Sequence, residues 1–175
     1  FTQIKQDFAN LTCCEAEKSI FIRSIRFIRV PVLITTWHLR QFDYFYSMTS
    51  MISEGVKVSV ETFYQADYSN PLQSEFMFAY RIALENHNSF PVKLHRRHWY
   101  IFDSNGSYRE VEGEGVVGVQ PTIQPGENYQ YVSGCNLRTE MGRMNGTYQM
   151  ENLHSKQMFE VSIPSFEMIV PMKNN

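Results

Sequence analysis

The stretch that decides the fold is Glu75-Phe-Met-Phe-Ala-Tyr-Arg-Ile-Ala-Leu-Glu85. Every second position from Phe76 to Leu84 carries a large apolar side chain, whereas the positions between them mix Met, Ala and Arg. A period of two places alternate side chains on opposite faces of a β-strand, and the more apolar face turns inward. The stretch therefore predicts a long, half-buried strand.

The same pattern continues on both sides of this stretch. Further strands are expected over residues 56–60, 92–102, 108–112, 129–133 and 157–163. Asp103-Ser-Asn-Gly106 predicts a hairpin turn, and Asn145-Gly146 predicts a second turn, because Asn and Gly tolerate a positive φ. Pro164 either confines the last strand to a sheet edge or ends it.

These strands predict an all-β protein, an immunoglobulin/fibronectin-III-like antiparallel β-sandwich of about seven strands. In Ile123–Tyr131, an apolar residue and a Pro-Gly turn precede a strand with an early tyrosine. This order is typical of a tyrosine corner, in which the hydroxyl bonds back to the preceding backbone. Trp99 is expected to fill a core position.

The distribution of glycine divides the chain. All nine glycines lie between Gly55 and Gly146, although residues 1–54 should contain about four at the average ~7%. The chain begins with Phe1 rather than with methionine, and its first methionines are Met48 and Met51. We therefore expect residues 1–50 to be an N-terminal extension, either translated from upstream of the true start or disordered, and residues 51–175 to be the domain. A native but unrelated extension and a targeting segment are the alternatives.

Composition excludes several classes of protein. With 43% hydrophobic and 19% charged residues, the chain does not have the composition of a disordered protein. A net charge of −2 gives no reason to expect a nucleic-acid partner, and no apolar run reaches the ~20 residues of a membrane span. Three cysteines favour a reducing compartment, so a cytoplasmic protein is expected.

Gly113-Glu-Gly115-Val-Val-Gly118 matches the pattern G-x-G-x-x-G. A dinucleotide site would need a helix after it, but Val119–Gly126 contains two prolines, so a Rossmann fold is rejected. Two interpretations remain: a structural loop, or a nest of backbone N–H groups that binds an anion. Three nearby glutamates oppose an anion at this loop: Glu110, Glu112 and Glu114.

The densest cationic stretch of residues 51–175 is Leu94–Trp99. On a regular strand Arg96 and His98 share one face, and His95 and Arg97 share the other. Such groups suit a phosphate or carboxylate; the alternative is a solvated strand face. Neither a catalytic constellation nor a metal-ligand spacing is recognisable, so no catalytic residue, metal site or cofactor is expected. The candidate ligand-binding residues are Gly113, Glu114, Gly115, Gly118, Arg97 and His98.

The assembled motifs resemble the ApaG family over about residues 52–171. The matching segments include residues 55–62, 97–104, 111–118, 131–135, 142–148 and 161–164. The resemblance implies a fibronectin-III-like sandwich and, for bacterial members, an association with magnesium and cobalt efflux. It also implies a suggested pyrophosphate site at Gly113, Gly115 and Gly118, and related eukaryotic domains look like protein-binding modules.

The expected function is therefore that of a bacterial, cytoplasmic, non-enzymatic domain in divalent-cation homeostasis. It would act by binding a protein partner or a phosphorylated ligand such as pyrophosphate or a nucleotide-like molecule, and a homo-oligomer is compatible with this. The alternatives are a pure protein–protein interaction module and, less favoured, a nucleotide or pyrophosphate hydrolase.

Overall fold

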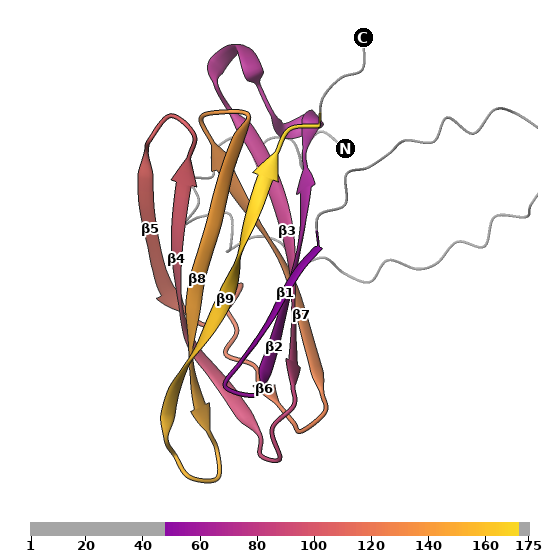
Figure 1. Ribbon diagram of the computed structural model, residues 1–175, viewed down its shortest axis with the longest axis vertical. Helices are drawn as coiled ribbons and strands as arrows, with labels where there is room; N and C mark the ends of the chain where they lie inside the picture. Colours follow the sequence, from indigo (N-terminus) through magenta and orange to yellow (C-terminus); the bar gives the residue numbers. More distant parts are fainter. Residues whose placement is uncertain (1–47, 172–175) are drawn as a thin grey trace, which may run out of the picture.

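The computed structural model describes residues 48–171, which form two antiparallel β-sheets packed face to face (Figure 1). One sheet has the strand order β1-β2-β3-β7, and the other has the order β5-β4-β8-β9, with β6 pairing to β4. The strands are β1 (Met48–Ser53), β2 (Val56–Tyr64), β3 (Phe76–Asn86), β4 (Val92–Asp103), β5 (Tyr108–Glu114), β6 (Thr122–Ile123), β7 (Asn128–Leu137), β8 (Met141–Asn152) and β9 (Met158–Ile169). Two short 3-10 helices, η2 (Ala66–Tyr68) and η3 (Pro71–Gln73), precede β3.

The predicted β-sandwich is confirmed. The described residues hold nine strands rather than about seven, and β1, β6 and β8 are the three over which no strand was expected. The hairpin at Asp103–Gly106 is also confirmed, since the N–H of Gly106 donates to the carbonyl of Asp103 at 2.9 Å. β1 crosses the boundary placed at residue 50, and residues 1–47 of the expected extension lie outside the described residues.

Aromatic side chains fill the space between the sheets. Trp99 is 2% exposed and makes edge contacts with the rings of Tyr148 and Phe166, at centroid distances of 6.2 and 6.1 Å. The hydroxyls of Tyr131 in β7 and Tyr148 in β8 lie 2.5 Å apart and so join the two sheets. Burial raises the pKa of both phenols above its ordinary value.

The tyrosine corner was expected within Ile123–Tyr131, and this contact shows that Tyr131 does not form it. Its side chain lies in the middle of the sandwich, where Tyr148 of the opposite sheet, rather than preceding backbone, meets its hydroxyl. Trp99, in contrast, occupies the expected core position.

The prediction of a turn at Asn145-Gly146 is wrong, because both residues lie inside β8. The pairing of β8 with β9 shifts here: Gly146 faces Ile163 and Met144 faces Phe166, so Pro164 and Ser165 both lie opposite Asn145. This β-bulge lets β9, an edge strand, pass through Pro164 and keep its apolar face inward. A Cβ at Gly146 would overlap the carbonyl oxygen of His98, so glycine is required by close approach.

We therefore expect Gly146→Ala to lower the free energy of unfolding by about 1–3 kcal/mol, the usual cost of overpacking. The matched control is Gly134→Ala in β7, where the new Cβ would lie at ordinary contact distance, 3.5 Å, from the carbonyl oxygen of Phe78. Urea unfolding followed by circular dichroism measures both. Equal midpoints for the two variants would contradict the assignment of Gly146 to a crowded bulge.

Candidate functional site

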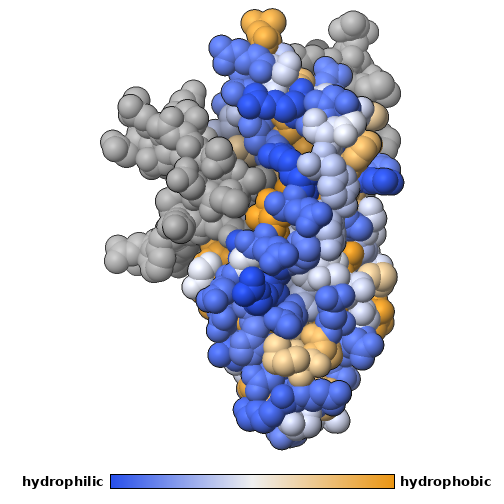
Figure 2. Space-filling view, turned by 90° about the vertical axis from the view of Figure 1, so that its left-hand side faces the viewer, coloured by the Kyte–Doolittle hydropathy of each residue, from blue (hydrophilic) through white to orange (hydrophobic). Residues whose placement is uncertain are grey.

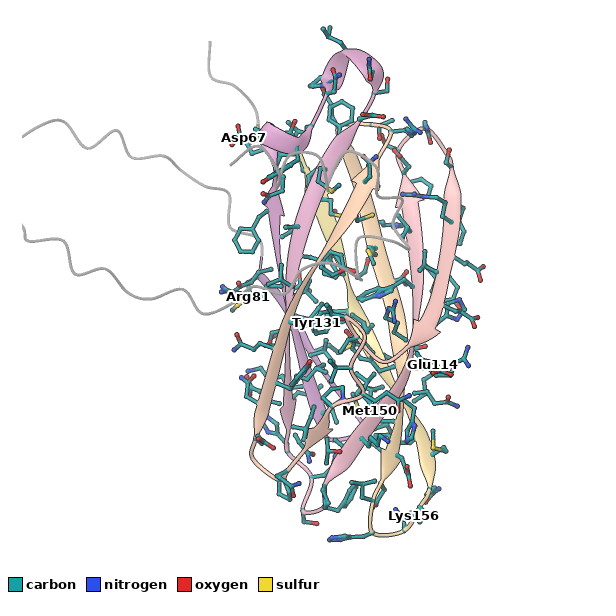
Figure 3. The ribbon with its side chains drawn as sticks, turned by 180° about the vertical axis from the view of Figure 1, so that it is seen from behind. Asp67, Arg81, Glu114, Tyr131, Met150 and Lys156 are labelled. Atoms are coloured by element: carbon teal, nitrogen blue, oxygen red, sulfur yellow. The ribbon has the colours of Figure 1, made fainter. Side chains whose placement is uncertain are left out.

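The glycine motif begins in β5 and continues as a loop that lies against β4. The N–H of Gly115 donates to the carbonyl of His95 in β4 at 2.7 Å, which anchors the start of the loop. Glu114, the last residue of β5, marks this place in Figure 3. The loop is thus attached to the second sheet immediately beside the cationic stretch of β4.

Arg97 does not share a face with His95, which corrects the regular alternation expected for this stretch. The register of β4 with β8 shifts between Leu94 and Arg96, so His95 is an extra residue. Leu94 and Arg97 consequently both point inward, and Arg97 is only 7% exposed. The ring of His95 instead meets the carboxylate of Glu151, with 2.7 Å between Nε2 and Oε2.

The buried guanidinium of Arg97 holds the glycine loop from the inside. Its Nη1 donates to the carbonyl oxygens of Glu114 at 3.0 Å and Gly115 at 2.8 Å. Gly113 lies opposite Arg97 in the ladder, and a Cβ there would come within 2.8 Å of the guanidinium. The first glycine of the motif therefore makes room for a buried arginine, because any side chain would displace it.

The rest of the motif closes on itself as a tight turn. Val116 and Val119 exchange backbone hydrogen bonds of 2.7 and 3.0 Å, and φ is positive at both central residues, +49° at Val117 and +74° at Gly118. Positive φ suits glycine but strains a β-branched residue such as Val117. At Gly115, φ is +59° and a Cβ would overlap the carbonyl of Val119. The N–H groups of Val116 and Val119 are thus engaged inside the loop, and the N–H of Gly115 is engaged by His95 of β4.

His98 lies on the opposite, outer face of β4, together with Arg96. The two side chains meet carboxylates of β5: His98 Nε2 is 3.1 Å from Glu110 Oε2, and Arg96 Nη2 is 3.5 Å from Glu112 Oε2. Glu112 also approaches His98 Nδ1 at 3.6 Å. Acidic and basic groups therefore alternate across this pair of strands, and Figure 2 shows this side of the molecule as mostly hydrophilic.

Aromatic rings run along the same outer face. The ring of Tyr100 packs against His98 at a centroid distance of 4.3 Å and lies 6.3 Å from the ring of Tyr108. Tyr108 is 59% exposed. Burial and then the nearby carboxylate of Glu110 raise the pKa of Tyr100. We call the surface made by Arg96, His98, Tyr100, Tyr108, Glu110 and Glu112 the β4–β5 face.

The six predicted site residues therefore form two groups. Gly113, Gly115, Arg97 and the carbonyl of Glu114 come together under the loop, and Gly118 forms its tip. His98 is separated from this group because it projects from the other face of β4. Sequence reasoning missed Tyr100 and Tyr108, although the period-two pattern of both hairpin strands would have placed them with the glutamates.

Elsewhere, a polar hollow of about 470 Å³ lies at the end of β3. It is lined by Glu85, Asn86, His87, Gly126 and Asn128. Hydrogen bonds from Lys57 and then His87 hold the pKa of Glu85 below its ordinary value. The carboxylate of Glu85 in this hollow is therefore already paired with Lys57 and His87.

Residues 48–171 contain neither a metal-binding cluster nor a membrane-spanning helix. Within that range no group of three His, Cys, Asp or Glu side chains is placed to hold a metal ion. In the same range no helix is long and apolar enough to cross a membrane.

We expect Arg97→Met to destabilise the fold by about 1.5–3 kcal/mol, because a charged donor to two carbonyls is lost. The loop should also open, so the amide hydrogens of Val116 and Val119 should exchange faster with deuterium. Arg96→Gln, which removes the neighbouring but exposed charge, should change stability by no more than about 0.5 kcal/mol. Unchanged exchange at Val119 in the Arg97 variant would contradict a supporting role for Arg97.

Comparison with known proteins extends these observations. A family model described as the ApaG domain matches residues 66–152. The proteins named ApaG of Brucella anthropi and Brucella abortus are each 44% identical over 124 residues, which is 71% of this chain and 95% of theirs. The crystal structure of an ApaA protein from Bordetella pertussis aligns with a TM-score of 0.64 and 38% identity, over 73% of this chain and 97% of that one. Because the relatives match along nearly their whole length, the chain belongs to the ApaG family.

Proposed function

We propose that the chain is a non-enzymatic module that binds a protein partner through the β4–β5 face and acts in cytoplasmic divalent-cation homeostasis. The observation that carries the binding mode is the row of rings formed by His98, Tyr100 and Tyr108, flanked by carboxylates. The role in cation homeostasis rests on the family resemblance.

The chemistry of this face suits a protein. Tyrosine and arginine are enriched at protein interfaces, since they supply large contact areas that also carry polar groups. Around the rings, three glutamates outnumber two permanent cations, Arg96 and Arg143, which stacks on the Phe102 ring opposite Tyr108. The glutamates are Glu110, Glu112 and Glu114. A partner surface that carries lysine or arginine would therefore be complementary to this face.

The geometry favours a protein over a phosphorylated ligand. Arg97 points into the sandwich and donates to carbonyls of the loop, and three amides of the loop bond within the chain. Arg96 and His98 both face carboxylates, so a phosphate would have to compete with these fixed anions. These contacts support the interpretation of the glycine motif as a structural loop.

We expect the full chain, immobilised and crosslinked in lysate of its own source, to capture a partner that Glu112→Lys captures at least about tenfold less. The reversed charge would face the basic surface of the partner. Glu140→Lys is the matched control, because it makes the same change at an exposed position away from the β4–β5 face. Quantitative mass spectrometry of the captured proteins measures the ratio.

A biological readout accompanies this experiment. In a bacterial strain deleted for its own ApaG-family gene, the wild-type chain and Glu140→Lys should restore growth in elevated cobalt, and Glu112→Lys should not. Equal capture and equal growth with both variants would remove the proposed face. Turnover of diadenosine polyphosphates by the pure protein, lost in Glu114→Gln, would instead establish a hydrolase.

A phosphorylated ligand is the second candidate, and the strained backbone of Val117 is the observation in its favour. Strain of this kind is often retained at ligand-binding turns. Under the protein-binding proposal, calorimetry with pyrophosphate should give no binding heat. Heat that disappears in Arg96→Gln, a variant that leaves the loop intact, would revive the anion site and displace our first proposal.

A further inference from the structure

The free edge of β5 offers a second means of recognition beside the β4–β5 face. β5 is the terminal strand of its sheet and pairs with β4 on one side only. The carbonyl of Ser107 and the N–H of Gly115 both bond toward β4. Because backbone groups alternate in direction along a strand, the N–H and C=O groups of Tyr108, Glu110 and Glu112 point to the open side.

The side chains at these same positions line the edge with negative charge. The side chains of Glu110 and Glu112 are 57% and 56% exposed, so their ion pairs with β4 leave carboxylate oxygens open to solvent. Two such edges would repel each other, since each glutamate would face a glutamate, and charged side chains are a known protection of edge strands. A strand with lysine or arginine at every second position would instead face opposite charges.

The other edge strands, β7, β9 and β1, lack the features that would select a basic strand. β7 has no charged side chain over Asn128–Leu137. β9 contains Pro164 and a bulge, which interrupt a regular ladder. β1 has only six residues and carries none of the four charged residue types. Among the strands of residues 48–171, β5 is therefore the edge whose charge specifies what can pair with it.

We propose that β5 binds an extended basic segment of the partner protein by strand addition. The segment pairs through its main chain with Tyr108, Glu110 and Glu112, and its alternate lysine or arginine side chains meet the glutamates on the outer face. This inference rests on the proposed function, since it specifies how the partner reaches the β4–β5 face. Main-chain pairing supplies the affinity, and the glutamates select the charge of the segment.

A synthetic peptide of alternating lysine and threonine, nine residues long, tests the mechanism on the full chain. It should bind, measured by calorimetry at low salt, and should slow deuterium exchange at the amides of Glu110 and Glu112. The same peptide with N-methyl groups on the amides that would face β5 keeps its charge but cannot pair, so it should bind at least about tenfold more weakly, since several main-chain hydrogen bonds are lost. A peptide with the same composition but all lysines in one block should give no protection.

Variants of the chain complete the test. Glu110→Gln with Glu112→Gln should weaken peptide binding about three- to tenfold, as expected for the loss of two cross-strand charge pairs. The control is Glu75→Gln with Glu140→Gln, which removes the same amount of charge at positions outside β4 and β5. It should leave peptide binding unchanged. Equal binding by the N-methylated peptide, or no protection at β5, overturns strand addition. If partner capture still depends on Glu112 in that case, the β4–β5 face stands and only the edge mechanism is lost.

Discussion

The extra residue that β4 carries at His95 decides which side chains of that strand enter the core. Before it, Val92 and Leu94 point inward; after it, the inward phase belongs to Arg97, Trp99 and Ile101. A regular strand would keep the phase of Leu94, and it would bury Arg96 and His98 while exposing Trp99. Because one position reverses every later side chain, both the aromatic core and the β4–β5 face depend on this bulge.

Burying the charged guanidinium of Arg97 costs free energy, and the glycine motif offsets this by providing space and hydrogen-bond acceptors. A guanidinium taken out of water needs hydrogen-bond acceptors, and the carbonyls of Glu114 and Gly115 provide two. Gly113 leaves the space, and Gly115 and Gly118 adopt the positive φ that turns the chain back over the arginine. A pattern that in other folds surrounds a phosphate here surrounds a cation belonging to the protein itself.

The same bulge separates two kinds of chemistry on one strand. Inward groups such as Arg97 and Trp99 lie between the sheets, where both side chains are almost fully buried. Outward groups such as His98 and Tyr100 lie beside the glutamates of β5. The β4–β5 face and the open edge of β5 therefore form one continuous surface that combines aromatic area and charge. This surface is distinct from the turn of the glycine motif at Val116–Val119.

Much of the fold could be predicted from local pattern, because a strand with one buried face must alternate. The stretch from Phe76 to Leu84, the hairpin at Asp103–Gly106 and the core position of Trp99 follow from that rule. The motif segments also sufficed to indicate the ApaG family. Asn145-Gly146 misled, since local preference for a turn cannot reveal that the carbonyl of His98 crowds the same residue from the neighbouring strand.

The candidate site was predicted less completely, for the same reason. Sequence by itself determined which residue types lie near one another along the chain, including the glycine motif and the row of glutamates. Only the tertiary structure decided that an extra residue at His95 puts Leu94 and Arg97 on the same, inward face of β4 and leaves His98 outward. A bulge depends on the register between β4 and β8, which pairs residues far apart in sequence, such as Leu94 with Met150. It is therefore a property of their pairing that neither strand shows alone.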